Sequence, residues 1–580
     1  MNEPCLPSRE KFYNFLTQSN ITEEQYEFAK KMFHDMGCKN LKDYLLNYQR
    51  SDVGLLADIQ ENHREAIFSM YQLDPAWFPT CPSLSWSSML KATRSSFDCL
   101  QDIELFRLIQ RGLTGGIVLM NTRHVKSNLP DLPDYDETKR GTQLLMYDIV
   151  SLYGYTMLQK LPARSYEKLT SLEIESLSAN NFEYFMNFQV PDINMILEVD
   201  FFIPRSKMDY WRDFPPGGVK SKIDIQSLSE GQVKLIEADR DGPNPLSTER
   251  LLFTLYPRKK FSVHANLHKF FIKHGCVLTK IWRGWKFSKQ AQMAGFIKHH
   301  IEERAKETDE VRRQILKNTM NMCYGTSIRS VWLDCLVKVA TNPHDATKFL
   351  AHPRLSSLTN LNHDLTIFSL RPPAVTLRMP YLVGFAILSL SKLHMYRLWY
   401  QEIVPLFKDR FASIVMMDTD SFLWELEVKP GERNVYHLLK KNWKIFDCSN
   451  LQSTHEFFCP DRKNHPGLLK SDFVTDITVY IGISPKVYYI GTLEDKENKR
   501  RMKGVLKRLV RILEERDYAT VLFEQESICF QMNLLCCKAQ KLYLLTVSKR
   551  GAGALTVKNY FLDELGIRTC PMGHYFCDDQ

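Results

Sequence analysis

The sequence predicts an α+β protein built from several subdomains, and three observations support this prediction. A chain of 580 residues with 44% hydrophobic composition is too long to fold around one compact core. Short apolar runs with strand character are mixed with long helical patterns. Stretches rich in proline, glycine or acids interrupt these patterns: 127–138 reads as a loop before a new domain, and 215–218 and 241–245 bracket an insertion.

Helical patterns dominate the first 110 residues, where Thr22 is predicted to cap the start of one helix. A glycine-bearing turn follows at 114–116. Two more helices are predicted over 286–304 and 311–325. The short link between them, at 308–309, predicts an antiparallel pair.

The charge balance suits a nucleic acid partner but is weak evidence by itself. A formal charge of +9 arises from 76 Lys and Arg against 67 Asp and Glu. The N-terminus has no apolar core of a signal peptide, and no window is apolar enough to cross a bilayer. The sequence therefore predicts a soluble, intracellular protein with no secretion signal and no membrane partner.

Two carboxylate motifs follow strand-like runs. Asp148 ends one such run, and Asp418 and Asp420 lie between two apolar stretches that predict a tight β-hairpin with the acids at its tip. Carboxylates at a sheet edge can hold Mg²⁺ together with phosphate oxygens, as nucleotidyl transfer requires. Asp-x-Asp pairs also occur in ordinary surface turns, as at Asp134 and Asp136. The uncharged run before Asp418 favours the metal interpretation.

One face of the helix predicted over 311–325 carries Arg313, Lys317, Asn321 and Tyr324 at helical spacing. Two cations, an amide and a phenol on one face could bind a triphosphate and cover a base pair. A solvated amphipathic helix gives the same pattern, and for a basic helix considered alone it is the commoner explanation.

In this order, the motifs resemble those of family B DNA polymerases. The first palm motif is matched at 148–154, the fingers motif at 317–325 and the second palm motif at 418–421, and Lys486-Val-Tyr488 and Lys503-Gly504 match two later elements. The sequence around these motifs is similar to the protein-primed branch of organellar and viral type, found in Maverick/Polinton transposons and related viruses. The resemblance covers nearly the whole chain and implies a right-hand fold with palm, fingers and thumb.

The resemblance implies a role for each matched residue. Asp148 and Asp418 would hold two Mg²⁺ ions, for which Mn²⁺ could substitute, and Asp420 would support them as a third catalytic residue. Tyr153 would exclude ribonucleotides by blocking the 2′-hydroxyl. The incoming deoxynucleoside triphosphate would be bound by Ser151, Leu152, Tyr153, Arg313, Lys317, Asn321, Tyr324 and Gly325. Template-primer DNA would be contacted by Gly115, Gly116, Thr419, Lys486, Tyr488, Arg500, Arg501, Lys503, Lys507 and Arg508.

Several of the residues expected to contact DNA lie in one stretch, 499–511, which holds seven basic residues and no acid. In a polymerase thumb it would follow duplex phosphates. A solvated helix face or a localisation signal would look the same.

The resemblance also implies a domain order. Tyr48 and Asp52 resemble the third motif of a proofreading exonuclease, but no earlier exonuclease motif precedes them. We therefore expect a remnant of a ribonuclease H-like 3′–5′ exonuclease domain, a helical connector, a palm with an insertion for a terminal priming protein, fingers, a second palm segment, and a thumb with the C-terminal region. These parts correspond to 1–65, 66–140, 141–285, 286–325, 326–430 and 431–580.

Three functions remain open. The chain could be an active DNA-directed DNA polymerase that replicates a transposon-like or viral element from a protein primer. It could be a catalytically decayed or domesticated relic that binds DNA or a priming protein, or an interaction module that docks a priming protein. Intact Asp148 and Asp418 favour the first over the second, and the nearly complete motif series argues against the third. In a eukaryotic source, the nucleus is the expected location.

Overall fold

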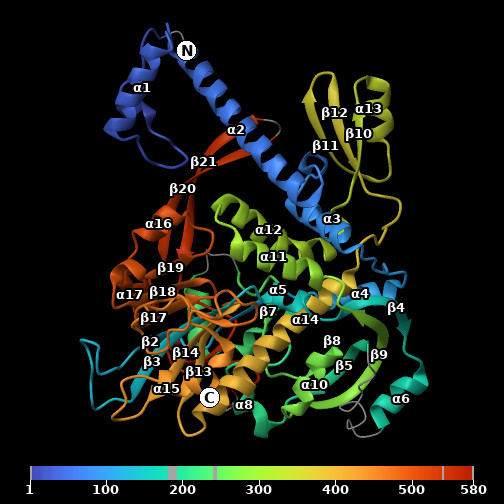
Figure 1. Ribbon diagram of the computed structural model, residues 1–580, viewed down its shortest axis with the longest axis vertical. Coiled ribbons are helices and arrows are strands. Elements are labelled where there is room, and N and C mark those ends of the chain that lie inside the picture. The colour runs from blue at the N-terminus through green and yellow to red at the C-terminus, as the bar shows by residue number, and fades with distance from the viewer. Residues whose placement is uncertain (1–2, 180–191, 240–243, 539–540, 578–580) are drawn as a thin grey trace. The chain divides into compact units, whose positions relative to one another are not determined.

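The computed structural model describes residues 3–179, 192–239, 244–538 and 541–577. The chain forms two compact units (Figure 1). Unit 1 comprises 1–92, 330–376 and 530–549, and unit 2 comprises 93–329, 377–529 and 550–580. Helices and mixed sheets occur together, which confirms the predicted α+β class. Of the predicted 241–245 boundary, residues 241–243 lie outside the described residues.

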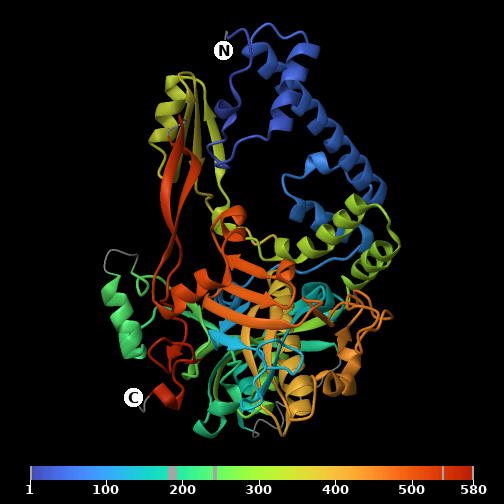
Figure 2. The same ribbon diagram turned by 90° about the vertical axis from the view of Figure 1, so that its left-hand side faces the viewer.

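Unit 1 combines long helices with a small antiparallel sheet. Thr22 caps its first helix as predicted, in a capping box with Gln25. The second helix is unbroken over 31 residues (Figure 2), and both Tyr48 and Asp52 lie within it with exposed side chains. The sheet has the order β10-β12-β11, and β20 pairs with β21. The elements that lie wholly or mostly in this unit are α1 (Glu23–Asp35), α2 (Leu41–Tyr71), α3 (Cys81–Thr93), β10 (Leu336–Ala340), α13 (Pro343–Leu350), β11 (Leu355–Asn362), β12 (Leu365–Leu370), β20 (Ile528–Lys538) and β21 (Lys541–Ala552).

The core of unit 2 is a ten-stranded sheet whose main path runs β1-β13-β14-β3-β17-β18-β19. The predicted strand before Asp148 is β3, which is buried over most of its length because neighbours cover it on both edges. The sheet continues through β16–β19 into the range expected to be thumb. Its strands are β1 (Ile117–Met120), β2 (His124–Lys126), β3 (Gly141–Ile149), β13 (Ala412–Thr419), β14 (Ser421–Val428), β15 (Phe446–Asp447), β16 (Leu469–Ser471), β17 (Ile477–Ser484), β18 (Val487–Thr492) and β19 (Lys499–Met502).

A second sheet of unit 2, ordered β4-β9-β5-β8, corrects one prediction. The helix expected over 286–304 begins only at Ala294, because residues 286–290 continue β9. This strand pairs with β4 on one side and β5 on the other, and two ladders of backbone hydrogen bonds override the local helical pattern. The elements here are β4 (Leu161–Lys168), α6 (Ser171–Ala179), β5 (Ile193–Phe202), α8 (Met208–Trp211), β8 (Arg258–His264), α10 (Ala265–Lys273) and β9 (Val277–Gln290).

Helices join the two sheets of unit 2. The helix predicted over 311–325 is α12 (Glu310–Ser327), which contacts α11 (Ala294–Lys306) after a short link. The helix α14 (Tyr381–Arg397) has 14 of its 17 residues buried, so it forms a core helix, and it touches α4, α5, α10, α12, β4 and β8. No helix in the described part of the chain has both the length and the apolar character to cross a bilayer. The remaining elements are α4 (Ile103–Gly112), α5 (Leu152–Met157), β6 (Val219–Ser221), α9 (Glu230–Ala238), β7 (Arg250–Leu252), α15 (Tyr436–Leu439), α16 (Lys507–Arg511), α17 (Glu515–Phe523), β22 (Tyr560–Phe561) and β23 (Thr569–Cys570).

A fully buried arginine fastens the C-terminal segment of unit 2 to the large sheet. Arg123, between β1 and β2, donates to the carbonyls of Gly482, Ala554 and Leu565 at 3.2, 2.6 and 3.1 Å. Burial lowers the pKa of this guanidinium to about 10, which leaves it charged at neutral pH. The carbonyl oxygens replace the water that the cation lost on folding.

We expect Arg123→Ala to loosen this segment, because the change leaves several buried carbonyls without a donor. The loss of local stability should be about 3 kcal/mol or more. Hydrogen exchange of amides in 553–570 measures it, with Arg433→Ala as the control at a site whose side chain is 77% exposed. Equal exchange in both variants would contradict a fastening role for Arg123.

Candidate active site

Three carboxylates meet at one end of the ten-stranded sheet. In the β13–β14 hairpin, which the sequence predicts, Asp418 lies opposite Ser421. Ser421 in turn lies opposite Asp148 on β3. Asp420 occupies the turn, and its carbonyl accepts a hydrogen bond from the Ile149 amide at 2.9 Å. Strand register therefore brings Asp148, Asp418 and Asp420 to the same edge of the sheet.

The acids repel one another at this edge. Burial, with added repulsion from Asp420 and Asp472, raises the pKa of Asp148 to about 7. Burial also raises the pKa of Asp420, with further repulsion from Asp418 and Asp472. Hard oxygen donors under mutual repulsion fit a divalent cation such as Mg²⁺. Within the described residues, however, no three His, Cys, Asp or Glu side chains converge on one cation position.

Asp472 is a fourth acid that the sequence analysis did not identify. It directly follows β16, which pairs with β3 so that Lys470 lies opposite Asp148, and its amide donates to the Met146 carbonyl at 3.0 Å. The signal was available in the sequence, since Asp472 follows a short strand just as Asp148 ends one. The run at 469–471 is too brief to stand out without its partner strand.

Two lysines supply the opposite charge. The Lys486 ammonium lies 2.5 Å from Asp418 Oδ1 and 3.4 Å from Thr419 Oγ1. Lys499 lies 2.8 Å from Asp472 Oδ2, and its charge opposes the rise in the pKa of Asp148. Lys486, predicted to contact DNA, is thus bonded to a predicted metal ligand in this structure.

A pair of stacked tyrosines connects the carboxylates to the predicted fingers helix. The rings of Tyr153 on α5 and Tyr324 on α12 stack with centroids 4.5 Å apart. Burial raises the pKa of both phenols, and the charge of Asp420 adds to both shifts. Lys317, exposed on the same helix, opposes the rise in the pKa of Asp148. The α12 face and the acids therefore border one site.

Backbone geometry at the start of α5 explains the glycine after Tyr153. Ser151 adopts a left-handed conformation with φ of 45°, which folds its hydroxyl back over the helix. A Cβ at Gly154 would come within 2.4 Å of Ser151 Oγ and within 3.6 Å of Met320 Sδ on α12. A larger residue here would require the Ser151 hydroxyl to move.

A second close approach involves the glycines predicted to contact DNA. A Cβ at Gly116 would lie 2.7 Å from Thr419 Cγ2, whereas Gly115 is exposed and faces open space. Thr419 itself has a φ of 71°, which the tight hairpin tip requires. The residues before β1 therefore lie directly against the hairpin that carries Asp418.

Several predicted ligand residues are engaged elsewhere in this structure. Arg313 donates to the Glu307 carbonyl at 2.6 Å and pairs with Glu310 at 3.1 Å. Arg500 donates to the Leu513 carbonyl at 2.6 Å. The side chains of Leu152 and Tyr488 are buried, at 3% exposure each. The predicted residues with exposed or half-buried side chains include Thr419, Asn321, Arg501, Lys503, Lys507 and Arg508, and Gly325 is half-buried.

Comparison with known proteins agrees with the motifs. Residues 5–213, which include Asp148 and Tyr153, match the family of DNA polymerase type B, organellar and viral. No curated protein matches the sequence. The match supports the resemblance to family B polymerases over the part of the chain that holds the first palm motif, and the fingers motif and later motifs lie outside it.

The chain is also similar to solved structures of Phi29 DNA polymerase. The orthorhombic crystal form has 12% identity and a TM-score of 0.49, with 92% of this chain and 74% of that chain covered. The ternary complex with primer-template DNA and incoming nucleotide substrates has 13% identity, a TM-score of 0.46, and coverage of 92% and 73%. The post-translocation binary complex with primer-template DNA has 13% identity and a TM-score of 0.45, with 81% of this chain and 67% of that chain covered.

The crowding at Asp148 predicts an unusual pH dependence of stability. Its pKa rises from 3.8 in the unfolded chain to about 7 in the fold, so between these values the folded protein holds a proton that the unfolded chain releases. Stability is therefore lost as the pH rises through this window. In chelator, Asp148→Asn should unfold at a higher temperature than the parent at pH 8, and the difference should vanish near pH 4.

Thermal unfolding at both pH values measures this effect, with Asp134→Asn, in an exposed loop, as the control. Added Mg²⁺ should stabilise the parent and not the Asp148→Asn variant. A variant less stable than the parent at pH 8 would contradict the repulsion described here.

Proposed function

We propose that this chain, which matches the type B DNA polymerases, joins deoxynucleotides to the 3′-hydroxyl of a primer under the direction of a DNA template. The observation that carries the proposal is the register that gathers Asp148, Asp418 and Asp420 beside the Tyr153–Tyr324 pair. Acids for metal binding and a cationic, aromatic helix face for a nucleotide are the two halves that this reaction needs.

Asp148 and Asp418 are the residues that would hold two Mg²⁺ ions, with Asp420 in support and Mn²⁺ able to substitute. When bound, such ions lower the pKa of a primer hydroxyl and neutralise the departing pyrophosphate. The raised pKa values of Asp148 and Asp420 support this assignment, because carboxylates that repel one another gain from a shared cation. Binding at Asp418 would compete with the Lys486 ammonium for the same oxygen.

The α12 face positions the nucleotide in this proposal. Lys317 and Arg313 would neutralise the triphosphate, which requires Arg313 to leave the Glu307 carbonyl. Asn321, Tyr324 and Gly325 would line the nascent base pair, and Ser151 and Leu152 would contribute backbone groups. Tyr153, held by its stack on Tyr324, would place its ring under the sugar and exclude a 2′-hydroxyl.

Template-primer DNA would lie across the same edge of the sheet. Gly115, Gly116 and Thr419 border the carboxylates, and Lys486 and Tyr488 follow on β17–β18 and would hold the primer end. The exposed cations of the basic stretch would contact phosphates without reading sequence: Arg501, Lys503 and Lys507, together with the half-buried Arg508 and Arg500. The second sheet, inserted between Asp148 and Lys317, is the proposed docking region for a terminal priming protein in replication of a transposon-like or viral element.

The alternative is a catalytically decayed relic that binds DNA or a priming protein without synthesis. The ion pair between Lys486 and Asp418 is the observation that favours it, because the ammonium holds an oxygen that catalysis needs. Primer extension by the purified protein with Mg²⁺ separates the two. Extension establishes the polymerase, and binding of primer-template DNA without extension establishes the relic.

Asp418→Asn should reduce primer extension by on the order of 10³-fold or more and leave affinity for primer-template DNA largely unchanged. The lost carboxylate acts on charge that develops in the transition state, more than on the ground-state grip on phosphates. Single-turnover extension and DNA binding measure the two effects. Asp134→Asn, in the exposed Asp-x-Asp pair of a surface loop, is the matched control. Undiminished extension by the Asp418 variant would refute the assignment.

Tyr153→Ala should admit ribonucleotides, because removal of the ring frees the space that a 2′-hydroxyl would occupy. Tyr153→Phe keeps the ring that stacks on Tyr324 and should retain discrimination, so it is the control. The ratio of deoxynucleotide to ribonucleotide incorporation measures the effect. An equal ratio in the alanine variant and the parent would reduce Tyr153 to a packing residue.

A further inference from the structure

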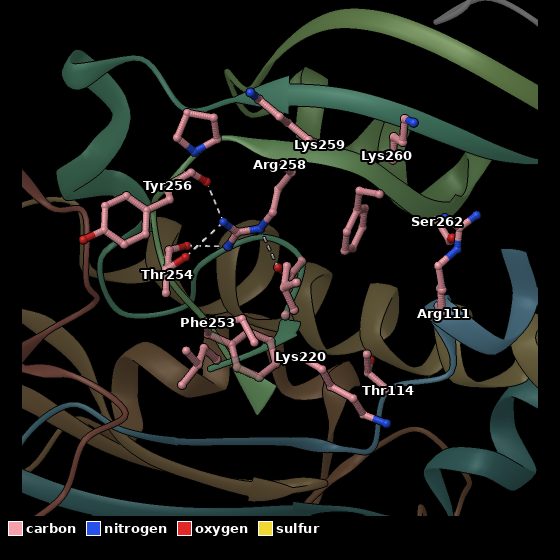
Figure 3. A pocket seen from close by; sticks show the side chains of 18 of the residues that line it. Arg111, Thr114, Lys220, Phe253, Thr254, Tyr256, Arg258, Lys259, Lys260 and Ser262 are labelled. Carbon is pink, nitrogen blue, oxygen red and sulfur yellow. Dashed lines mark hydrogen bonds between the residues drawn. The ribbon is translucent and has the colours of Figure 1, made fainter. Parts of the chain in front are cut away.

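Unit 2 contains a large pocket that is distinct from the candidate active site (Figure 3). Its volume is about 890 Å³, and it lies between the end of α4, the 217–227 segment, β8 and α14. The proposed catalytic residues do not line it. The pocket is connected to them by sequence, since Thr114 lines it and Gly116, two residues later, packs on Thr419 beside Asp418.

Four lysines line the pocket with exposed side chains: Lys220, Lys222, Lys259 and Lys260. Among the described residues, no carboxylate forms an ion pair with any of them. Lys260 lies 4.8 Å over the ring of Trp282, a contact that attracts the cation without neutralising its charge. The two acids that line the pocket, Asp224 and Glu249, do not balance this charge.

A fifth lysine lies at the floor. Lys392 on α14 donates to Thr114 Oγ1 at 2.6 Å, and no described carboxylate pairs with it. Burial lowers its pKa to about 8, so the ammonium remains largely charged at neutral pH. Lys392 is half-buried, and in the described part of the chain its ammonium bonds only a hydroxyl, so an anion in the pocket would stabilise it.

Two arginines in the lining are not available to a ligand. Figure 3 shows the Arg258 guanidinium turned toward Thr254 and the Tyr256 carbonyl, and it also bonds the Gly217 carbonyl. Arg111 is bonded to Glu198 at 2.7 Å. The five lysines therefore carry the charge that a ligand would meet.

Aromatic side chains give the pocket a second character. Tyr256, 45% exposed, and the half-buried Phe261 are the rings that a ligand could reach, whereas Phe253 lines the pocket with only 3% exposure. Aromatic rings among unpaired cations are the combination that binds unpaired nucleotides, because the rings stack on bases and the cations attract phosphates. A volume of about 890 Å³ is in the range of pockets that hold small ligands of nucleotide size.

We propose that this pocket binds the phosphates and bases of an unpaired DNA strand that passes the active site. The inference rests on the proposed polymerase function, because that function brings DNA to Gly115 and Gly116, which directly follow the pocket residue Thr114. The site is separate from the contacts assigned to the primer end, which belong to β17–β19.

The first test compares Lys259→Ala/Lys260→Ala with the charge-matched control Lys139→Ala/Lys496→Ala, whose side chains are 74% and 82% exposed at other sites. Binding of a single-stranded oligonucleotide and of a blunt duplex is measured over a range of salt concentrations. The pocket variant should bind the single strand about tenfold more weakly, with a salt slope smaller by about 1. Its binding of the blunt duplex should match the control.

An unchanged salt slope on the single strand would overturn the proposal. Loss of affinity for an acidic priming protein with unchanged single-strand binding would overturn it too, and would assign the surface to a protein. Equal losses of affinity for the single strand and the duplex would show only a general electrostatic effect of the lysines. That result would also contradict the proposal.

The second test uses Lys392. Lys392→Met should raise the unfolding temperature of the DNA-free protein and weaken single-strand binding, two changes that loss of fold cannot produce together. A variant that binds the single strand as tightly as the parent would refute the role of Lys392. Primer extension by the parent is measured separately. If the parent does not extend a primer but binds a single strand through these lysines, the proposal for the pocket stands and only the proposed polymerase function is refuted.

Discussion

Eight residue pairs join β14 to β3, from Ser421 opposite Asp148 to Val428 opposite Gly141. Side chains alternate along a strand, so a slip of one residue would turn Asp148 to the other face and take it away from the hairpin tip. The buried faces of both strands oppose such a slip, because Leu145 lies opposite Trp424 and both are largely or fully buried. The packing of the sheet thus sets the separation of the acids on which the proposed chemistry depends.

That separation has an energetic consequence. Carboxylates held together by a rigid sheet cannot move apart to relieve their repulsion, and the structure responds in two ways. Burial and repulsion raise the pKa of Asp148 and Asp420, and Lys486 and Lys499 supply positive charge to Asp418 and Asp472. Local stability is reduced where a ligand would bind, as at sites built for function. Lys486 bonds Asp418 in this structure, and in the proposed reaction it would exchange with the cation.

Local patterns in the sequence were enough to predict the strand at Asp148, the hairpin at Asp418 and the helix that carries Lys317, because each has a long apolar or periodic run. They failed at 286–290, where two partner strands decide the conformation and neither is visible locally. Asp472 was missed because its strand is three residues long. Lys392 could not be identified at all, since its burial depends on α14 being enclosed by elements distant in sequence. The roles assigned to the site residues remain predictions.

One segment, 112–116, contacts both the pocket and the candidate active site, and glycines at its two ends allow this close packing. A Cβ at Gly112 would come within 2.5 Å of Phe385 on α14, the helix that also carries Lys392, and one at Gly116 would meet Thr419 at the hairpin tip. The segment from 112 to 116 is therefore held at both ends by close packing, and Thr114 between them bonds Lys392. A larger residue at either glycine would push this segment away from the core helix or from the acids. A DNA strand bound in the pocket as proposed would therefore be spaced from Asp418 by this close packing, which gives glycine a structural role at both positions besides any contact with DNA.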